Sequence, residues 1–416
     1  MKLNDIAEFV TDKISSSSIS LDRYVTTDSL LQNRRGREIA QNLPPVPCAL
    51  THYKQGDVLV ANIRPYLKKV WYADSEGGCS SDVLVFRAKN GHCPPFLYTV
   101  LMQDAFFDYA MSGAKGSKMP RGDKDQIMRY ELPTFTPMEE ENIGNMMVDI
   151  MSKININRQI NDNLEAMAKQ LYDYWFVQFD FPNEEGKPYK SSGGAMVWNE
   201  NLKREIPKGW HVLSVNDIAA NVRGVSYTKD DLVNSNNGVL VLRGNNIQDN
   251  HIIYDSNVAY IPKSFISKEQ HIKPLDIIMT MSSGSKEHIG KSAMFQFASG
   301  DTFGAFLTKF TAKEHCAYLL FNLFNSQYFK AKIKSIACGT GINNLTNQTF
   351  DEIYIVMPQD EILLEFDKRQ SQIFAEIGLI EKSNVELTKQ RDELIPLLMN
   401  GQASVNYHLS VFYTKR

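Results

Sequence analysis

The sequence predicts a mixed α/β (α+β) protein in which two similar heads alternate with two long, paired helices. Strand-like and helical segments follow one another in the same order in residues 1–136 and 211–357. A long amphipathic helix follows each of these blocks, and their apolar positions match at a constant spacing of 223 residues, as from Ile143 to Phe366. Such a duplication predicts a pseudo-twofold arrangement, in which the helices run antiparallel and separate the two heads.

Residues 1–136 are the first predicted head. The segments 57–61 and 82–86 are rich in β-branched residues and lie between glycine-containing turns, which predicts strands. A helical piece is expected near residues 96–111. Prolines then end the head, and acidic residues follow in the first turn of the long helix, where they complement the helix dipole.

Two long spacer helices are expected in residues 137–180 and 358–401. Their apolar positions recur in steps of four and three, which is typical of a helix that packs along a partner helix. Three asparagines within the seam are expected to fix its register at some cost in stability. The seam positions of the two helices are Ile143, Met147, Ile150, Ile154, Asn157, Asn161, Leu164, Ala168, Leu171 and Trp175, then Phe366, Gln370, Ile373, Ile377, Ile380, Asn384, Leu387, Arg391, Leu394 and Leu398.

The second half repeats the first after a central linker. Residues 181–210 form this linker, which begins as an irregular segment rich in Pro, Gly and Ser. Residues 211–357 are the second predicted head, in which residues 215–219 echo residues 3–7. The two heads differ from each other by insertions in their loops, which indicates a shared scaffold with divergent loops. Residues 402–416 are a tail without a predicted structure.

The composition describes an ordinary globular protein. Hydrophobic residues make up 43% and charged residues 22%, and the net charge of -3 neither favours nor excludes a nucleic-acid partner. Five scattered cysteines lack the spacing of a zinc site, and a reducing compartment fits them best. The sequence shows no signal peptide and no membrane-spanning run, so we expect a soluble, cytoplasmic protein.

No motif predicts catalysis or a bound metal. Residues 284–292 resemble a phosphate-binding P-loop, but five residues separate the glycines where that motif has four. A strand is expected next, so no helix N-terminus would receive a phosphate, and a hairpin loop presenting Lys286 and Lys291 is favoured. Asp180 with Glu185 and Lys187 resembles a nuclease signature only faintly. We therefore expect no catalytic residue, no metal and no cofactor.

Basic and amide side chains in the loops of both heads are candidates for DNA binding. Arginine can pair with guanine and asparagine with adenine in the major groove, while lysine suits phosphates. For any single residue a solvated turn remains the alternative, and only the recurrence in both heads favours binding. The candidates are Arg34, Arg35, Arg64, Tyr66, Lys118 and Arg121 in the first head, and Arg223, Arg243, Asn245, Asn246, Lys286, Asn343 and Asn344 in the second.

An aromatic run lies where the first long helix ends. Tyr172, Tyr174, Trp175 and Phe176 either pack the helix onto a head or form a docking surface for a partner protein. The sequence leaves both interpretations open.

Three central stretches carry a family resemblance. Residues 171–182, 186–194 and 202–210 resemble the central conserved region of Type I restriction-modification specificity subunits. Residues 62–66 and 116–121 are similar to one recurrent type of target-recognition domain in that family. The resemblance covers nearly the whole chain.

The resemblance implies a non-catalytic subunit with two target-recognition domains. These would bind the two halves of a bipartite duplex DNA site, and two methyltransferase subunits and two restriction (motor-nuclease) subunits would assemble on the chain. S-adenosylmethionine, ATP and magnesium would belong to those partners. A helix of about 36 residues spans roughly 54 Å, which suits two half-sites on one face of a duplex, whose major-groove entries lie roughly 34–36 Å apart. A coiled-coil adaptor that binds only protein, or a nucleotide-dependent enzyme, is the alternative.

Overall fold

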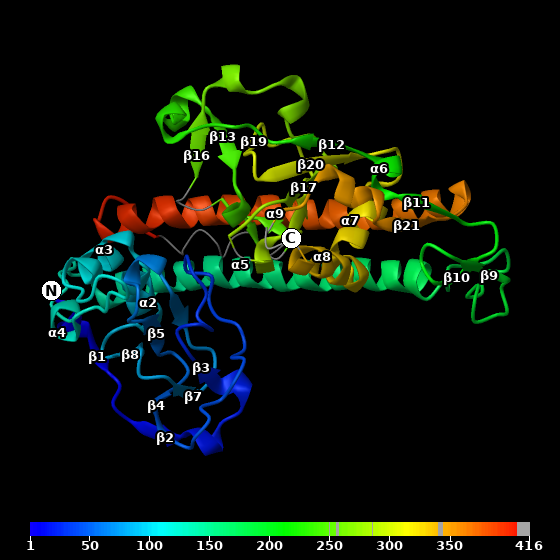
Figure 1. Cartoon of the computed structure of the whole chain (residues 1–416). Coiled ribbons are helices and arrows are strands. Elements are labelled where there is room, and N and C mark those ends of the chain that lie inside the picture. The colour runs from blue at the N-terminus through cyan, green and yellow to red at the C-terminus, as the bar shows by residue number, and fades with distance from the viewer. Residues whose placement is uncertain (249, 255–257, 285, 340–343, 406–416) are drawn as a thin grey trace, which may run out of the picture. The chain divides into compact units, whose positions relative to one another are not determined.

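The structure is a computed structural model of the chain (Figure 1). It describes residues 1–248, 250–254, 258–284, 286–339 and 344–405, without the side chains of 286 and 337–339. The chain forms two compact units, and each is described by itself. The first unit comprises Met1–Gln159 with Glu381–Arg416, and the second comprises Ile160–Ile380.

An antiparallel sheet lies at the centre of the first unit. Its strands are ordered β1-β8-β5-β6, and the short helix α1 (Leu3–Ile6) leads into the first of them. The predicted strands 57–61 and 82–86 correspond to β5 and β8, whose inward residues are fully buried. The strand bounds are β1 (Ala7–Phe9), β5 (Val58–Ala61), β6 (Val70–Tyr72) and β8 (Val83–Ala88).

A second sheet of the first unit has the order β2-β4-β7-β3, in which β3 and β7 run parallel. Gly77 allows this close approach, because a Cβ atom there would lie 2.1 Å from the carbonyl oxygen of Arg23. The strand bounds are β2 (Lys13–Ser15), β3 (Tyr24–Val25), β4 (Ala49–Tyr53) and β7 (Gly77–Cys79).

The helical piece expected near residues 96–111 is two helices. Helix α2 (Pro94–Met102) packs on strands of the central sheet, and α3 (Asp104–Ser112) follows directly (Figure 1). The break occurs at Gln103, whose backbone is extended and whose side-chain amide donates to the Val100 carbonyl. A third short helix, α4 (Lys124–Ile127), completes the head.

The second unit repeats this topology. Helix α6 (Val215–Ile218) leads into a sheet of order β12-β20-β17-β18, and every neighbouring pair in it is antiparallel. The corresponding helices α7 (Ala317–Asn325) and α8 (Gln327–Gly339) follow β20, as α2 and α3 follow β8. The strand bounds are β12 (Ala219–Arg223), β17 (Ile277–Thr280), β18 (Ser292–Met294) and β20 (Leu307–Ala312).

The smaller sheet of the second unit has the order β16-β13-β19, with β13 and β19 parallel. This parallel pair corresponds to β3 and β7 of the first unit. A short hairpin, β14 with β15, follows β13. The bounds are β13 (Val239–Leu242), β14 (Ile247–Gln248), β15 (His251–Ile252), β16 (Ala259–Ile261) and β19 (Thr302–Phe303).

The two long helices are α5 (Pro137–Tyr172) and α9 (Asp360–Met399), and in both units their segments pack antiparallel (Figure 1). None of the predicted seam positions is exposed. In the first unit, Asn157 Nδ2 donates to Asn384 Oδ1 at 2.9 Å. In the second unit, Gln370 Nε2 donates to the Ala168 carbonyl at 2.8 Å. Both bonds satisfy polar groups within the seam, which confirms the predicted paired-helix fold.

The central linker is more ordered than its composition suggests. A single π-helical turn, η4 (Asp173–Val177), ends the long helix. After it the chain packs Phe181 and Trp210 into the core of the second unit, with their rings stacked at 4.7 Å. The linker also contains a hairpin of β9 (Met196–Asn199) and β10 (Arg204–Pro207). The strands β11 (His211–Ser214) and β21 (Tyr354–Met357) then frame the second head.

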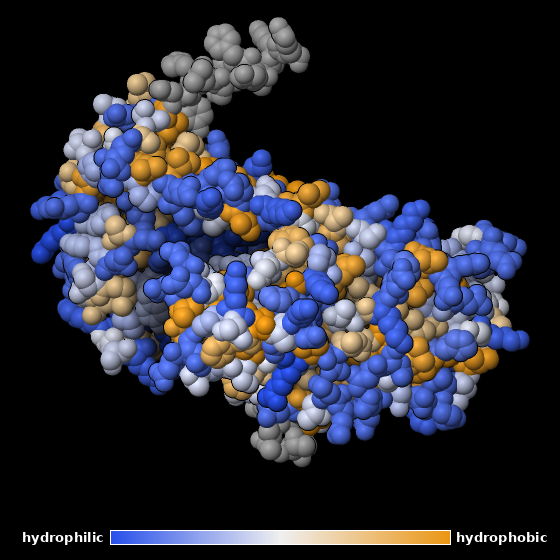
Figure 2. All heavy atoms as spheres, turned by 90° about the horizontal axis from the view of Figure 1, so that it is seen from above, coloured by the Kyte–Doolittle hydropathy of each residue, from blue (hydrophilic) through white to orange (hydrophobic). Residues whose placement is uncertain are grey.

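Figure 2 shows one face of the molecule, on which hydrophobic residues lie dispersed among hydrophilic ones. Among the described residues, no helix combines the length and apolar character that crossing a membrane requires.

Candidate nucleic-acid interface

Three loops of the first unit meet where β5 ends. Arg64 N donates to Pro120 O at 2.7 Å, and Gly122 N donates to Asn62 O at 3.2 Å. Asn62 N in turn donates to the backbone oxygen of Asp82 at 2.8 Å. We call this cluster the first tip, and it comprises residues 62–67, 80–82 and 115–122.

The first tip carries exposed basic side chains. The Arg121 side chain is 57% exposed, and its Nη2 lies 3.1 Å from Asp82 Oδ1. Lys118 is exposed, and so is Tyr66. Arg64 is half-buried with a positive φ of 52°, and none of the described residues accepts a hydrogen bond from its Nε. The loop therefore offers guanidinium and ammonium donors that suit bases and phosphates.

Arg34 serves the fold of the first unit. Its guanidinium is buried and ion-paired with Asp104, and Nε donates to the Met102 carbonyl. Burial acts to raise the pKa of Asp104, but hydrogen bonds and charges from Lys68 and Arg34 outweigh it and lower that pKa. Arg35 is half-buried, and its carbonyl accepts a bond from Arg158 of α5. Because Arg34 is committed to these contacts, we leave it out of the interface.

The second unit builds an equivalent cluster with the same backbone bonds. Met281 N donates to Phe306 O at 2.9 Å, and Leu345 N donates to Met281 O at 2.8 Å. Ser282 forms a β-bridge with Asn344, as Ile63 does with Arg121. We call this cluster the second tip, and it comprises residues 281–284, 304–306 and 344–345.

Arg223, which contacts the second tip, and Asn344, which lies in it, are both exposed. Arg223 Nε donates to the Ala305 carbonyl at 3.1 Å, so this side chain braces the turn that carries Phe306. Asn344 lies in the same bridge position as Arg121 of the first tip. Asn245 is exposed on the turn η7 (Gly244–Asn246), which follows β13.

Asn246 has a structural role. It is fully buried, its Oδ1 accepts from Arg243 N at 2.9 Å, and its Nδ2 donates to the Ile253 carbonyl at 2.9 Å. Thr26 N donates to the buried Ser29 at the corresponding turn of the first unit. Asn246 is thus a cap within a turn and not a base-reading residue. Arg243 itself is half-buried.

Two further candidates cannot be assigned side-chain positions. Lys286 opens the short turn η10 (Lys286–His288), but its side chain lies outside the described part of the chain. Asn343 lies entirely outside the described residues.

Sequence and structure comparisons point to one family. Residues 207–397 match the family model described as "Type I restriction modification DNA specificity domain". The StySPI specificity subunit of Salmonella potsdam is 31% identical over 202 residues, which are 47% of this chain and 41% of that relative. The HindI specificity subunit of Haemophilus influenzae is 21% identical over 96% of this chain and 98% of its own length. Residues 207–397 therefore carry the DNA specificity domain of Type I restriction-modification systems.

A solved structure supports the fold. The S subunit of a Type I restriction-modification system from M. genitalium has a TM-score of 0.56 and 12% sequence identity, and the match covers 96% of this chain and 95% of that one. At this identity the likeness shows the fold alone. This chain matches less than half of the length of the StySPI subunit.

The aromatic run at residues 172–176 is mostly core. Tyr172, Trp175 and Phe176 are buried, and the Phe176 and Phe366 rings meet at 4.7 Å. Burial raises the pKa of the Tyr172 hydroxyl far above its ordinary value. Only Tyr174 is exposed, at 39%. The plain-core interpretation therefore holds for three of the four predicted docking residues.

The loop that resembles a P-loop joins two strands. It connects β17 to β18, and Gly290 N donates back to the Thr280 carbonyl at 2.9 Å. A strand follows this loop, as predicted, and β18 offers no helix N-terminus for a phosphate. No group of three or more metal-ligating side chains was found among the described residues.

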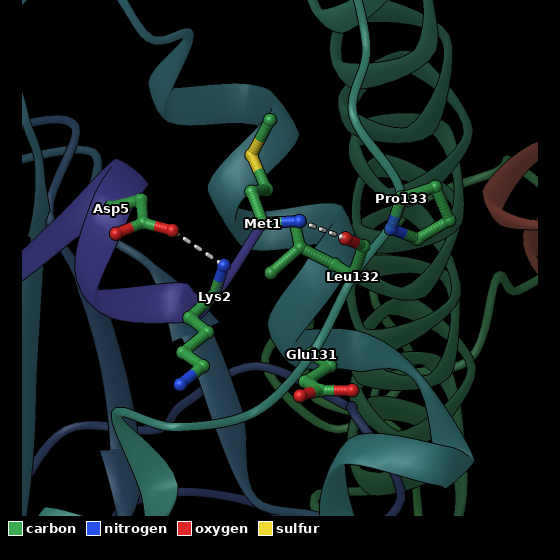
Figure 3. A pocket seen from close by; sticks show the side chains of 6 residues that line it. All are labelled: Met1, Lys2, Asp5, Glu131, Leu132 and Pro133. Atoms are coloured by element: carbon green, nitrogen blue, oxygen red, sulfur yellow. Dashed lines mark hydrogen bonds between the residues drawn. The ribbon is translucent and has the colours of Figure 1, made fainter.

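A shallow pocket of about 560 Å³ lies beside the first residue of the chain (Figure 3). Its polar groups bond one another. Met1 N donates to the Leu132 carbonyl at 2.8 Å, and Asp5 accepts a bond from the Lys2 backbone at 2.7 Å. These contacts tie the first strand region to the end of the head, so we assign the pocket no ligand.

Sequence reasoning did not single out Asp82 and Phe306, although both lie in the tips. Each lies in a turn just before a strand of the central sheet, and each belongs to a tip. Neither residue type stands out in a loop by itself. Asp82 pairs with Arg121, and the Phe306 carbonyl accepts a bond from Ser282, the bridge partner of Asn344, so only contacts between distant segments reveal them.

Proposed function

We propose that this chain is a specificity subunit that recognises a bipartite duplex DNA site, with the first tip reading one half-site and the second tip reading the other. The observation that carries this proposal is the shared backbone framework of the two tips, which presents different polar side chains from each unit. A common scaffold with divergent loops suits two readers of different sequences.

The helices α5 and α9 are proposed to set the gap between the half-sites. The 36 residues of α5 span roughly 54 Å at about 1.5 Å per residue, which exceeds one turn of duplex. Insertion of one helical turn into both helices should lengthen the methylated gap and leave both half-sites unchanged. An unchanged gap would refute this role for the helices.

The subunit is proposed to act in the cytoplasm without catalysis or a cofactor of its own. Two methyltransferase subunits would dock on the helices and central linker, and two restriction subunits would complete the complex. Two aromatic side chains near the linker are available to contact such partners: Tyr174 is 39% exposed and Trp198 is 58% exposed.

Binding measurements on the assembled methyltransferase complex test DNA recognition. Lys118→Ala should weaken binding to all duplexes and reduce the salt dependence by about one phosphate contact. Arg121→Ala should relax the choice of base in one half-site. Lys13→Ala, in β2 of the same unit, is the matched control and should change neither quantity. If DNA binding by the native complex were absent or insensitive to salt, a protein-binding adaptor would replace this proposal.

A further inference from the structure

The turns that carry Asp82 and Phe306 occupy equivalent places in the two units. In the first unit, Ser80 N donates to Val25 O at 2.9 Å, and Val83 N donates to Ser80 O at 3.1 Å. These bonds attach the turn to the parallel strand β3 and close it before β8. Asp82 is the last residue before that strand.

The second unit repeats both bonds. Gly304 N donates to Leu242 O at 2.9 Å, and Leu307 N donates to Gly304 O at 2.8 Å. Phe306 is the last residue before β20, and its carbonyl accepts from Met281 N as that of Asp82 accepts from Asn62 N. The two positions are therefore structurally equivalent, although one is a carboxylate and the other a phenyl ring.

The two equivalent positions have different polar neighbours. Asp82 pairs with Arg121, whereas the carbonyl of Phe306 accepts a bond from Ser282 N, the β-bridge partner of Asn344. An aspartate can orient an arginine through Nη2 while other donors of the guanidinium, which has five N–H groups, face a ligand. A phenyl ring offers an asparagine no hydrogen bond. It adds an apolar surface to the second tip.

Phe306 is exposed on a turn that several backbone hydrogen bonds stabilise. Its side chain is 66% exposed, which is the largest exposed fraction of any aromatic side chain in the described part of the chain. Its carbonyl accepts bonds from Met281 N at 2.9 Å and Ser282 N at 3.3 Å, and Arg223 braces the preceding residue. A single exposed phenyl ring is ordinary on a protein surface, but this ring lies on a turn that several backbone hydrogen bonds fix, so it presents a defined apolar surface to a ligand.

We propose that Phe306 and Asn344 read an A·T pair in the second half-site, where Asp82 and Arg121 read a G·C pair in the first. Asparagine pairs with adenine in the major groove, and thymine alone presents a methyl group there that an apolar side chain can contact. Arginine pairs with guanine O6 and N7. This inference rests on the proposed recognition of DNA, and it assigns Phe306 as a specificity-determining residue.

Thymine-to-uracil substitution tests the methyl contact directly, because uracil differs from thymine only by that methyl group. The complex of the full chain with its methyltransferase partners would first be used to map the methylated motif. Its affinity would then be measured for duplexes with one thymine of the second half-site replaced by uracil. We expect one such replacement to weaken binding about four-fold, the value of one buried methyl group.

Variants then assign that loss to Phe306. The complex with Phe306→Ala should bind the native duplex about four-fold more weakly than the unchanged complex does. This variant should bind the native duplex and the uracil duplex with equal affinity. Phe265→Ala removes another partly exposed phenyl ring of the same unit and should keep the thymine preference. Asp82→Ala should weaken the choice of guanine in the first half-site and leave the thymine preference intact.

Three results would overturn the inference. The first is a second half-site without an A·T pair, and the second is a thymine preference that persists in Phe306→Ala. The third is an equal loss in Phe265→Ala. Each of these leaves sequence-specific binding by the native complex intact, whereas failure of the proposed function would appear as the absence of that binding.

Discussion

Lys309→Met should destabilise the second unit by about 3–5 kcal/mol, because it leaves a buried carboxylate without its counter-charge. Lys309 Nζ lies 3.1 Å from Asp276 Oδ2, and the two side chains are 5% and 1% exposed. Asp276 would keep bonds from Lys273 N at 2.8 Å and Thr311 Oγ1 at 2.5 Å. These remaining bonds place the expected loss near the lower end, at about 3 kcal/mol.

Urea denaturation of the full chain at neutral pH measures this loss. The double variant Asp276→Asn with Lys309→Met removes the buried charge and should recover a large part of the stability. Arg87→Met is the matched change in the first unit, where Arg87 Nη2 lies 2.7 Å from Asp57 Oδ2. Arg87 is more exposed, so its loss should be smaller, because water can partly solvate Asp57. A loss under about 1 kcal/mol in Lys309→Met, or a double variant no more stable than the single one, would show that this ion pair does not stabilise the unit as expected.

Three further predictions concern the turns, the seam and pH. Gly56→Ala should lower the unfolding free energy by about 1 kcal/mol, since a side chain is strained at φ 89° although the nearest atom is 3.8 Å away; an unchanged thermal midpoint would contradict it. Asn157→Leu should cost about 1–2 kcal/mol by leaving the amide of Asn384 unpaired, and Asn384→Leu added to it should restore stability in the same urea assay. The hydrogen bond to Asp367 raises the pKa of His315 above 6.5, so its stabilising effect should be full below pH 6.5 and decline as the pH rises through the folded-state pKa. Asp367→Asn should remove that pH dependence from the thermal midpoint, and a persisting dependence would assign it elsewhere.

Residue type alone did not distinguish the interface from the scaffold. Arg34 and Arg121 are both loop arginines with basic neighbours, yet one is buried on Asp104 and the other is largely exposed. Asn246 and Asn344 differ in the same way, since one caps a turn and the other lies exposed in a β-bridge. Burial depends on which distant segment packs over a loop, and neither propensity nor local spacing reports that.

Sequence-based prediction was limited in a similar way for the aromatic run at residues 172–176. Its density suggested either a core or a docking surface, and packing against Phe366 and Trp210 assigns most of it to the core. The exposed Trp198 lies in a hairpin that composition alone described only as linker.

The sequence by itself indicated the duplication, the strands at residues 57–61 and 82–86, and the seam of the paired helices. These features follow from periodicity, which is a local property of the chain and is repeated in both halves. Only the tertiary structure decided which side chains meet at the tips. The bonds that join residues 62, 82 and 122, and likewise 281, 306 and 345, connect segments far apart in sequence, so the chemistry of the tips depends on packing that no short window contains.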